Sequence, residues 1–471
     1  MFNKINDSII KDLIAICGQN NVLTCREEIA GYSYDEYVNQ LPGCVPEVVV
    51  RPGSTEEVSA ILKLAEENRV PVTPRGGGTG LAGGCVPVHG GIVLSMQRMN
   101  RFLEMDRKNQ MAVVEAGLTL GEFIQAVEKE GFYFPPHPGD EGAMFGGMIA
   151  TNAGGSRAVK YGVIRNYIRG LEVVLSGGQV IHPGGKLIKN STGYNLLHLF
   201  IGSEGTLGVI TRAIVQVMTR PTFLRTMVIP FNSIEQAIDN VPLIFEKGIV
   251  PMAVEFVGLD VIQLTEKHLN LNWPSHQGEV HLMVIVDSPS EDDLSRMTDQ
   301  IADVVLENGA VDVFVADTKA KQDEVLKIRS EIYEAIKKET VDILDICVPR
   351  SEIPGHMRKV QEVAQRYDLW LPSFGHAGDG NIHIHLMKAR YEKGQMVPVS
   401  YEEIKDRLEA ARQELFKDAA ARGGVISGEH GIGLYKKNYL SLSLEAGQIE
   451  MMKRIKQALD PQGILNPGKI F

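Results

Sequence analysis

The chain has 471 residues, of which 44% are hydrophobic and 23% are charged, and its net charge is −11. This length exceeds what one hydrophobic core usually supports, so we expect two or three globular domains. The acidic balance, with no basic block, disfavours nucleic acid as a partner. We also see no signal peptide and no apolar run long enough for a membrane span. The five cysteines are scattered, without a Cys-x-x-Cys motif, which disfavours a disulfide framework or an iron–sulfur cluster and favours a cytoplasmic protein.

The first part of the chain is predicted to form a mixed α/β domain. Two of its helices are marked by capping boxes, Ser54-Thr-Glu-Glu57 and Thr119-Leu-Gly-Glu122. Expected elements, in chain order, are a helix at 6–17, a strand at 48–50, a helix to about 68, strands at 70–73, 92–95 and 112–116, a helix from 119 to 131, a hairpin at 171–181 and a strand at 207–218. Residues 135–170 are rich in Pro, Gly, Ala and Asn, which is typical of loops whose backbone approaches a ligand.

Residues Arg75 to Gly84 hold six glycines in ten positions, directly after an expected strand. Backbone N–H groups in such a loop can form a nest that fits a pyrophosphate. A plain turn is the alternative, but six glycines are more than a turn needs. A strand is expected after the loop, where a nicotinamide dinucleotide fold would have a helix, and the Gly-Lys-Ser/Thr of a P-loop is missing. Nicotinamide and ATP are therefore disfavoured as ligands of this loop.

A new pattern begins near Arg220-Pro221 and predicts a second domain. Strands at 226–231, 252–257, 280–286 and 311–316 alternate with helices at 233–247, 260–268 and 291–308, which favours a ferredoxin-like sheet. Further helices are expected at 320–338, 351–367 and 401–422, before a turn-rich tail at 458–469. We therefore divide the chain into 1–220, 221–425 and a C-terminal segment, 426–471, that packs back on the first domain.

Three of the twelve histidines fall within His376–His385. The segment Asn381-Ile-His-Ile-His-Leu386 alternates polar and apolar residues, so we expect a strand with His383 and His385 on one face. A tight Gly378-Asp-Gly380 turn could fold His376 back toward His383. Glu429 and His430 stand side by side between glycines further on. Two imidazoles and a carboxylate favour a divalent metal site with open positions and a nearby base; hydrogen-bonded core histidines are the alternative.

Five stretches in chain order resemble the FAD-binding domain of the vanillyl-alcohol-oxidase superfamily, over roughly residues 40–220. They are Pro71–Gly80, Pro135-Pro-His-Pro-Gly-Asp140, Gly146–Gly155, Lys160-Tyr-Gly162 and Gly202–Gly208. The resemblance implies that the glycine loop cradles the FAD pyrophosphate, that the second and third stretches wrap the ribityl chain and flavin, and that Glu204 and the strand after it lie near the adenine or ribose. Implied FAD-binding residues are Arg75, Gly76, Gly77, Gly78, Thr79, Gly80, Leu81, Pro138, Gly146, Gly147, Thr151, Asn152, Gly154, Gly155, Tyr161, Gly162, Glu204, Gly205, Val209, Ile210 and Asn466. Cys85 and His137 lie nearby, but no tethering motif surrounds them, so we expect non-covalent FAD.

The downstream motifs His376–His383, Ser427–Gly433 and Leu465–Lys469 resemble the FAD-linked oxidase C-terminal domain. That domain is found in D-lactate dehydrogenases, glycolate oxidase large subunits and D-2-hydroxyglutarate dehydrogenases. The resemblance implies that His376, His383 and Glu429 bind a divalent metal, with zinc, iron(II) and manganese equally suited, and that His430 is the base. His385 stands where 2-hydroxyglutarate members have Asn, which disfavours a dicarboxylate substrate.

One further motif, Val348-Pro-Arg-Ser351, resembles a family segment whose arginine holds the substrate carboxylate. We therefore assign that role to Arg350, because a planar guanidinium is suited to bidentate binding of a carboxylate. Arg329 is a second candidate, and a surface helix charge is the alternative for it.

Together these features predict an α+β protein with a two-part FAD-binding domain and a ferredoxin-like substrate (cap) domain. The chain most resembles the lactate dehydrogenase subunit of electron-bifurcating complexes. That resemblance implies an FAD- and metal-dependent 2-hydroxy-acid dehydrogenase that oxidises D-lactate and passes electrons to an electron-transfer flavoprotein. A glycolate oxidase large subunit with an iron–sulfur partner and a D-2-hydroxyglutarate dehydrogenase are the nearest alternatives. A non-catalytic FAD electron-transfer subunit with structural zinc and a nicotinamide-dependent reductase are alternatives of other kinds.

Overall fold

The structure is a computed structural model that describes residues 2–37 and 44–471. Its contacts divide the chain into two units, each of which is built from more than one stretch of sequence. Unit 1 comprises the N-terminal residues up to Gly154, then Val163–Arg220 and Glu429–Phe471. Unit 2 comprises Gly155–Gly162 and Pro221–Gly428. The short stretch 155–162 therefore belongs with the second half of the chain, although it lies in sequence among the FAD-binding motifs.

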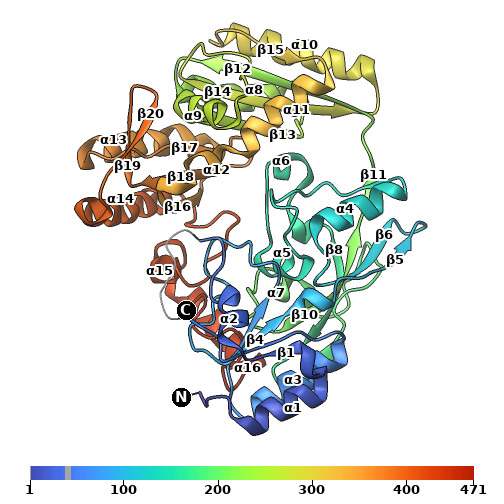
Figure 1. Cartoon of the computed structure of the whole chain (residues 1–471). Helices are drawn as coiled ribbons and strands as arrows, with labels where there is room; N and C mark the ends of the chain where they lie inside the picture. Colours follow the sequence, from blue (N-terminus) through green and yellow to red (C-terminus); the bar gives the residue numbers. More distant parts are fainter. Residues whose placement is uncertain (1, 38–43) are drawn as a thin grey trace. The chain divides into compact units, whose positions relative to one another are not determined.

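Unit 1 contains two sheets (Figure 1). The first has the order β1 (Val22–Leu23), β2 (Val48–Val50), β4 (Ile92–Ser95) and β3 (Val72–Arg75), with β2, β4 and β3 parallel. The second is antiparallel, in the order β5 (Phe102–Asp106), β6 (Met111–Glu115), β10 (Val209–Gln216), β8 (Ile168–Val174) and β9 (Val180–Ile181). A separate pair joins β7 (Phe132–Tyr133) and β11 (Met218–Thr219).

Helices of unit 1 begin where the sequence provides caps. In α1 (Asp7–Cys17), Asn6 accepts a hydrogen bond from the Ile9 N–H, and the helix ends at Gly18, whose φ is +81°. In α3 (Thr55–Glu67), Ser54 accepts from the Glu57 N–H. The remaining helices of four or more residues in this unit are α2 (Arg26–Ile29), α4 (Leu120–Lys129), α5 (Phe145–Thr151), α7 (Leu196–Phe200), α15 (Leu440–Ser443) and α16 (Ala446–Leu459).

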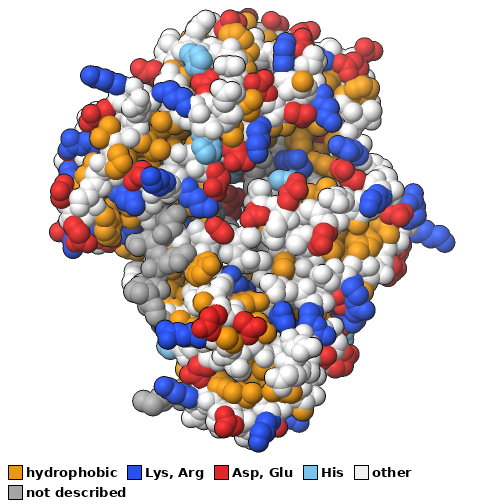
Figure 2. All heavy atoms as spheres, viewed as in Figure 1, with side chains coloured by type: hydrophobic (Ala, Val, Ile, Leu, Met, Phe, Trp, Pro, Cys, Tyr) orange, Lys and Arg blue, Asp and Glu red, His pale blue; other side chains and the backbone are white. Residues whose placement is uncertain are grey.

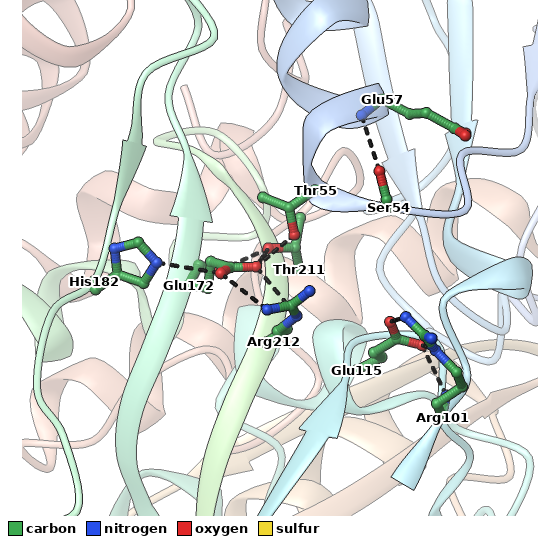
Figure 3. A network of polar contacts seen from close by, with 9 residues as sticks. All are labelled: Ser54, Thr55, Glu57, Arg101, Glu115, Glu172, His182, Thr211 and Arg212. Carbon is green, nitrogen blue, oxygen red and sulfur yellow. Dashed lines mark hydrogen bonds and ion pairs between the residues drawn. The ribbon is translucent and has the colours of Figure 1, made fainter. Parts of the chain in front are cut away.

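A largely buried carboxylate joins helix α3 to the second sheet of unit 1 (Figure 3). Glu172 on β8 accepts hydrogen bonds from Thr55, the first residue of α3, and from Thr211 on β10. His182 and Arg212 pair with the same side chain at 3.2 and 3.4 Å. Burial alone would raise the pKa of Glu172, but these hydrogen bonds and charges lower it. The network fixes the N-terminus of α3 against the second sheet.

Unit 2 is built on one antiparallel sheet of seven strands (Figure 1). Four of them run in the order β15 (Phe314–Ala316), β12 (Phe223–Phe231), β14 (Val280–Ser288) and β13 (Ala253–Gly258), which is the 4-1-3-2 order of a ferredoxin-like fold. Helices α8 (Ile234–Glu246) and α10 (Glu291–Glu307) pack on β12 and β14. The predicted ferredoxin-like sheet is therefore confirmed.

Three more strands extend this sheet beyond β13, and they carry the histidines. Their order is β17 (Ser373–His376), β18 (Asn381–Met387) and β16 (Thr340–Cys347). The other elements of unit 2 are α6 (Ala158–Tyr161), α9 (Leu259–Leu269), α11 (Lys319–Ser330), α12 (Ile332–Ile336), α13 (Ile353–Tyr367), α14 (Tyr401–Ala421) and the hairpin β19 (Ala389–Glu392) and β20 (Gln395–Pro398). Among the described residues, no helix is both long enough and apolar enough to cross a membrane. Acidic and basic side chains are interspersed on the face drawn in Figure 2.

Candidate active site

The glycine-rich loop leaves β3 at Arg75, whose side chain is buried. The Arg75 guanidinium donates to the Tyr34 carbonyl at 2.6 Å and to the Cys85 sulfur at 3.0 Å. Burial also raises the pKa of the Cys85 thiol to about 11, so this thiol is protonated at neutral pH. Arg75 therefore fixes the two ends of the loop to the N-terminal segment, and the loop between them presents mainly backbone groups.

Asp35 holds the same loop from the N-terminal segment. Its carboxylate accepts hydrogen bonds from the Gly83 N–H at 2.7 Å and from the Tyr37 N–H at 3.1 Å, and its side chain is almost completely buried. Burial raises the pKa of Asp35 to about 6, although the hydrogen bonds and the Arg75 charge oppose this shift. A group from outside the predicted motifs thus supports the glycine loop.

This raised pKa predicts a measurable pH dependence of stability. Since the folded protein binds the Asp35 proton below about pH 6 and the unfolded chain only near pH 4, this group contributes stability that grows as the pH falls through 6. From pH 7.5 to pH 5 we expect the unfolding free energy of the wild type to rise by about 1 kcal/mol relative to Asp35→Asn. Urea unfolding of both proteins at the two pH values measures this change in unfolding free energy. The same difference between wild type and Asp35→Asn at both pH values would contradict the prediction.

Three of the five predicted FAD-binding stretches lie together with the C-terminal tail in unit 1. A Cβ on Gly76 would lie 3.4 Å from the Met144 Cβ, just before α5, and one on Gly205 would lie 3.3 Å from Pro74. The backbone N–H of Glu204 donates to the Ala150 carbonyl of α5 at 2.8 Å. The Asn466 amide donates to the carbonyls of Gly84 and Glu204 at 2.8 and 2.7 Å. The glycine loop, α5, the 202–210 segment and the C-terminal tail therefore lie together.

The side chain of Glu204 has a partner that the sequence did not suggest. Its φ is +51°. Its two carboxylate oxygens accept from the backbone N–H groups of Ile432 and Gly433 at 2.8 and 2.7 Å. Burial raises the pKa of this carboxyl. Glu204 therefore fixes the loop after His430, and an adenine or ribose beside it would meet its backbone and not a free carboxylate.

The geometry of unit 1 fits a flat cofactor such as FAD. A Cβ built on Gly84, Gly139 or Gly147 would have no atom within 4 Å, so the backbone at these glycines faces open space. Gly147 belongs to α5, in the stretch implied to wrap the flavin. Bare backbone facing open space is what close contact with a ring system and phosphates needs. The other predicted residues of this unit lie in the same loops and in α5, or, for Val209 and Ile210, at the start of β10.

Three predicted FAD-binding residues, Gly155, Tyr161 and Gly162, belong instead to unit 2. The Tyr161 hydroxyl donates to Asp287 at 2.5 Å, and the neighbouring Lys160 ammonium pairs with the other oxygen of Asp287 at 2.6 Å. Asp287 is itself buried, near the end of β14. The tyrosine hydroxyl thus attaches this short stretch to β14 of unit 2.

In unit 2, strand pairing brings a set of polar side chains into a buried cluster. Glu255 on β13 is opposite His376 on β17, and Asp345 on β16 is opposite His383 on β18. The His376 Nδ1 donates to Glu255 at 2.6 Å, and the imidazole planes of His376 and His383 are nearly perpendicular with centroids 5.3 Å apart. Asp345 accepts from the Asn381 amide at 2.8 Å.

Four side chains form a group that could hold a metal ion: Asp345, His383, Glu429 and His430. One ligand atom from each lies within 4.8 Å of the others. Glu429 follows directly on Gly428, whose N–H donates to the Asp345 carbonyl at 2.9 Å, so the chain delivers it to this place. Imidazole and carboxylate donors suit zinc, iron(II) or manganese.

The structure thus groups three residues that the sequence had singled out, His383, Glu429 and His430. It adds Asp345, which the sequence did not suggest. It gives His376 a different immediate partner, Glu255.

Within unit 1, the Glu429 carboxylate lies against Gly154, in the stretch predicted to wrap the flavin. A Cβ on Gly154 would lie only 2.5 Å from the Glu429 Oε2. We therefore expect Gly154→Ala to displace this carboxylate, because the backbone can move less than a glutamate side chain. The predicted result is about tenfold weaker metal binding with near-normal stability, measured by chelator competition and thermal unfolding. Gly447→Ala is the matched control, because it adds a methyl group at a glycine with open space around it; unchanged metal affinity in Gly154→Ala would contradict the prediction.

The two candidate arginines have different surroundings. Arg350 is exposed, and its guanidinium lies 4.6 Å from the centre of the Phe245 ring. Arg329 on α11 is largely buried; it pairs with Glu255 at 2.5 Å and lies 5.0 Å from the centre of the Phe374 ring. The Arg329 Nε is buried and has no hydrogen-bond partner among the described residues. Through Glu255, Arg329 is the arginine that is joined to the histidine cluster.

His385 lies on the same strand as His383 and is almost fully buried. Its ring stacks on Phe374, with centroids 4.8 Å apart, and lies 5.8 Å from the Tyr333 ring. The ring that lies against Arg329 is that of Phe374, and His385 stacks on the same ring.

Comparison with known proteins identifies the family of the chain. Residues 220–470 match the family described as FAD linked oxidases, C-terminal domain, and residues 46–184 match an FAD binding domain. The chain belongs to the FAD-linked oxidase family. The sequence-based assignment to this family and to FAD-dependent enzymes is therefore confirmed.

Several curated members of the FAD-linked oxidase family match most of the chain. A D-lactate dehydrogenase of Archaeoglobus fulgidus is 45% identical, covering 90% of this chain and 91% of that protein. A D-lactate dehydrogenase of Anaerostipes hadrus is 39% identical, covering 100% and 98%. Glycolate oxidase subunit GlcD of Bacillus subtilis is 37% identical, covering 99% and 97%.

Solved structures bear on the fold alone. p-Cresol methylhydroxylase with bound substrate has a TM-score of 0.78 at 17% identity, covering 98% of this chain and 96% of that one. A 4-ethylphenol oxidase from Gulosibacter chungangensis has a TM-score of 0.78 at 21% identity, covering 100% and 98%. The predicted two-part FAD-binding fold is confirmed by this likeness.

Proposed function

We propose that this FAD-linked oxidase is a metal-dependent dehydrogenase of 2-hydroxy acids and that its substrate is D-lactate. The observation that carries the proposal is the pairing of a metal-ligand group, Asp345, His383, Glu429 and His430, with a buried arginine that is joined to the same cluster of strands. A cation and an arginine are the groups needed to bind a hydroxyl and a carboxylate on adjacent carbons. The names of the relatives, D-lactate dehydrogenase and glycolate oxidase subunit, support the same class of substrate.

Each residue then has one task. Arg329 binds the substrate carboxylate through its planar guanidinium, and Arg350 is the second candidate for that task. His430 accepts the hydroxyl proton as the C–H bond breaks. FAD, when bound, accepts the hydride from the α-carbon. A divalent metal, when bound, would be held by His376, His383 and Glu429, with His430 kept as the base, and would lower the pKa of the substrate hydroxyl.

Substrate size is the basis for preferring lactate. Phe374, His385 and Tyr333 lie close to one another, and Phe374 is in contact with Arg329. Phe374 beside Arg329, with His385 and Tyr333 next to it, suits a methyl side chain better than a second carboxylate.

Anaerobic flavin reduction tests the proposal. The metal-replete, FAD-loaded protein is mixed in turn with D-lactate, L-lactate, glycolate and D-2-hydroxyglutarate, and flavin absorbance near 450 nm is followed. Rapid bleaching by D-lactate, abolished by chelation, is the expected result. Preferential bleaching by glycolate would favour a glycolate oxidase subunit instead. Bleaching by NADPH alone would indicate a reductase, and no bleaching at all would indicate an electron-transfer subunit.

The electrons must then leave the flavin. We propose a protein acceptor of the electron-transfer flavoprotein type, because the five free cysteines of this chain include no cluster-binding motif that would carry them onward. Free thiols also suit the cytoplasm as the site of action. Reoxidation of the D-lactate-reduced protein by a purified electron-transfer flavoprotein, compared with reoxidation by air, tests the acceptor.

A further inference from the structure

We propose that Glu255 is a positioning residue that sets both halves of the site, holding His376 for the metal and Arg329 for the substrate carboxylate. This inference rests on the proposed function and adds a residue that neither the motifs nor the resemblance suggested. It concerns a single carboxylate in the middle of the seven-stranded sheet of unit 2.

The position of Glu255 follows from strand pairing. It lies on β13, directly opposite His376 on β17, and its side chain is 1% exposed. One oxygen, Oε1, accepts from the His376 Nδ1 at 2.6 Å, and the other, Oε2, accepts from the Arg329 guanidinium at 2.5 Å. Each oxygen therefore serves one of the two functional side chains.

The hydrogen bond to Glu255 settles the orientation of the His376 ring. A carboxylate can only accept, so Nδ1 carries the proton and Nε2 is the nitrogen that could bind a metal. A carboxylate behind a ligating imidazole fixes its tautomer, holds the ring in place and makes it a stronger ligand. The ring of His376 is thereby held nearly perpendicular to that of His383, at 88°.

The second hydrogen bond restrains Arg329. It uses one end of the guanidinium and leaves the buried Nε without a partner among the described residues. The guanidinium is also held over the ring of Phe374. An arginine fixed on two sides loses little side-chain entropy when a carboxylate binds.

The charge of Glu255 agrees with this double role. The Glu255 carboxylate is buried and forms an ion pair with the Arg329 guanidinium, in a place where an unpaired charge would be strongly disfavoured.

Glu255→Gln is the variant that tests the inference, because it keeps the shape and removes the charge. We expect 10- to 100-fold weaker binding of Zn²⁺ and Mn²⁺ by the FAD-loaded protein, measured by competition with a chromophoric chelator. We also expect a raised KM for D-lactate, because Arg329 is released. Glu255→Asp, which keeps the charge, should recover part of the metal affinity. Combining Glu255→Gln with His376→Ala should weaken metal binding no more than His376→Ala alone.

Glu266→Gln is the matched control. Glu266 is a second largely buried carboxylate of unit 2 that pairs with a histidine, His276 at 2.8 Å, outside the proposed site. The Glu266→Gln variant should have the metal affinity and the KM for D-lactate of the wild type. FAD content and circular dichroism of each variant report whether the protein has folded, and a misfolded Glu255→Gln is replaced by Glu255→Asp in the comparison.

The outcomes separate this inference from the proposed function. Wild-type metal affinity in Glu255→Gln, or an equal loss in Glu266→Gln, would overturn the inference. A wild-type protein that binds metal but oxidises no hydroxy acid would overturn the proposed function, while the metal-affinity comparison would still decide the role of Glu255. A wild-type protein that binds neither Zn²⁺ nor Mn²⁺ would overturn the inference together with the metal dependence.

Discussion

Replacing His430 by alanine should slow D-lactate-dependent flavin bleaching by about 10²- to 10⁴-fold, the range typical for loss of a general base. His430 is the one member of the metal-ligand group to which we assign the hydroxyl proton, and its Nε2 lies 4.0 Å from the adjacent Glu429. Without it the proton must pass to water or to a weaker base. Stopped-flow absorbance under anaerobic conditions measures the rate.

Two controls make the His430 result interpretable. Metal and FAD contents of His430→Ala must be measured, since the imidazole belongs to a group of potential ligands. His276→Ala removes a histidine of unit 2 that is 54% exposed and should bleach at the wild-type rate. A metal-replete His430→Ala that bleaches within tenfold of the wild type would rule out His430 as the base.

Replacing Arg329 by methionine should lower kcat/KM for D-lactate by about 10²- to 10³-fold, which corresponds to about 3 to 4 kcal/mol. The reason is that a buried, charge-assisted bidentate interaction with the carboxylate is lost. Methionine keeps an unbranched side chain but removes the guanidinium that lies over the Phe374 ring. Arg329→Lys keeps a positive charge beside Glu255 but lacks the planar fork, so we expect an intermediate loss.

The companion variant Arg350→Met decides between the two arginines. Arg350 is exposed over the Phe245 ring, so we expect less than a fivefold change in kcat/KM. Steady-state kinetics with a dye acceptor compares the three variants. A larger loss of kcat/KM at Arg350 than at Arg329 would show that Arg350, the residue favoured by the sequence motif, binds the substrate carboxylate.

Local rules predicted the elements whose caps and apolar periods are strong. The helix expected at 6–17 is found at Asp7–Cys17, because Asn6 and Gly18 mark its ends. The four strands of the ferredoxin-like part were expected within a few residues of their observed bounds. In both cases one face is buried, so the pattern of side chains reports the structure directly.

Elements that depend on tertiary packing were missed. Residues 135–170 were expected to be loops, but α5 forms at Phe145–Thr151. Two glycines weaken its intrinsic helix propensity. The helix forms because Phe145 is buried against Phe123, with ring centroids 4.6 Å apart, and because the Gly146 N–H donates to the Ala116 carbonyl. Likewise the helix expected at 320–338 is two helices, which meet at Glu331.

The candidate site was predicted only in part, because some of its residues stand in recognisable motifs and others are brought in by tertiary packing. Histidines and glycines stand out in a sequence, so the motif residues could be named. Glu255 is the one acid of an apolar strand and Asp345 is one of two acids in another, and acids are rarely buried unless they are paired. Asp345 lies on β16, a strand that was not predicted, because buried acids interrupt its pattern. A signal was present all the same: an acid within an apolar run needs a partner, and here the partners are Asn381 and Ser427.

The interleaving of the two units limits how family members can exchange parts. A chimaera that takes the substrate-binding half of a relative must carry two pieces of gene, for Gly155–Gly162 and for Pro221–Gly428. Transfer of the long piece alone would set the relative's counterpart of Asp287 beside a Lys160-Tyr161 pair that had not changed with it. A single recombination point near residue 220 is therefore a poor way to exchange unit 2 between relatives. We expect Gly155–Gly162 and Pro221–Gly428 to be inherited together in working enzymes.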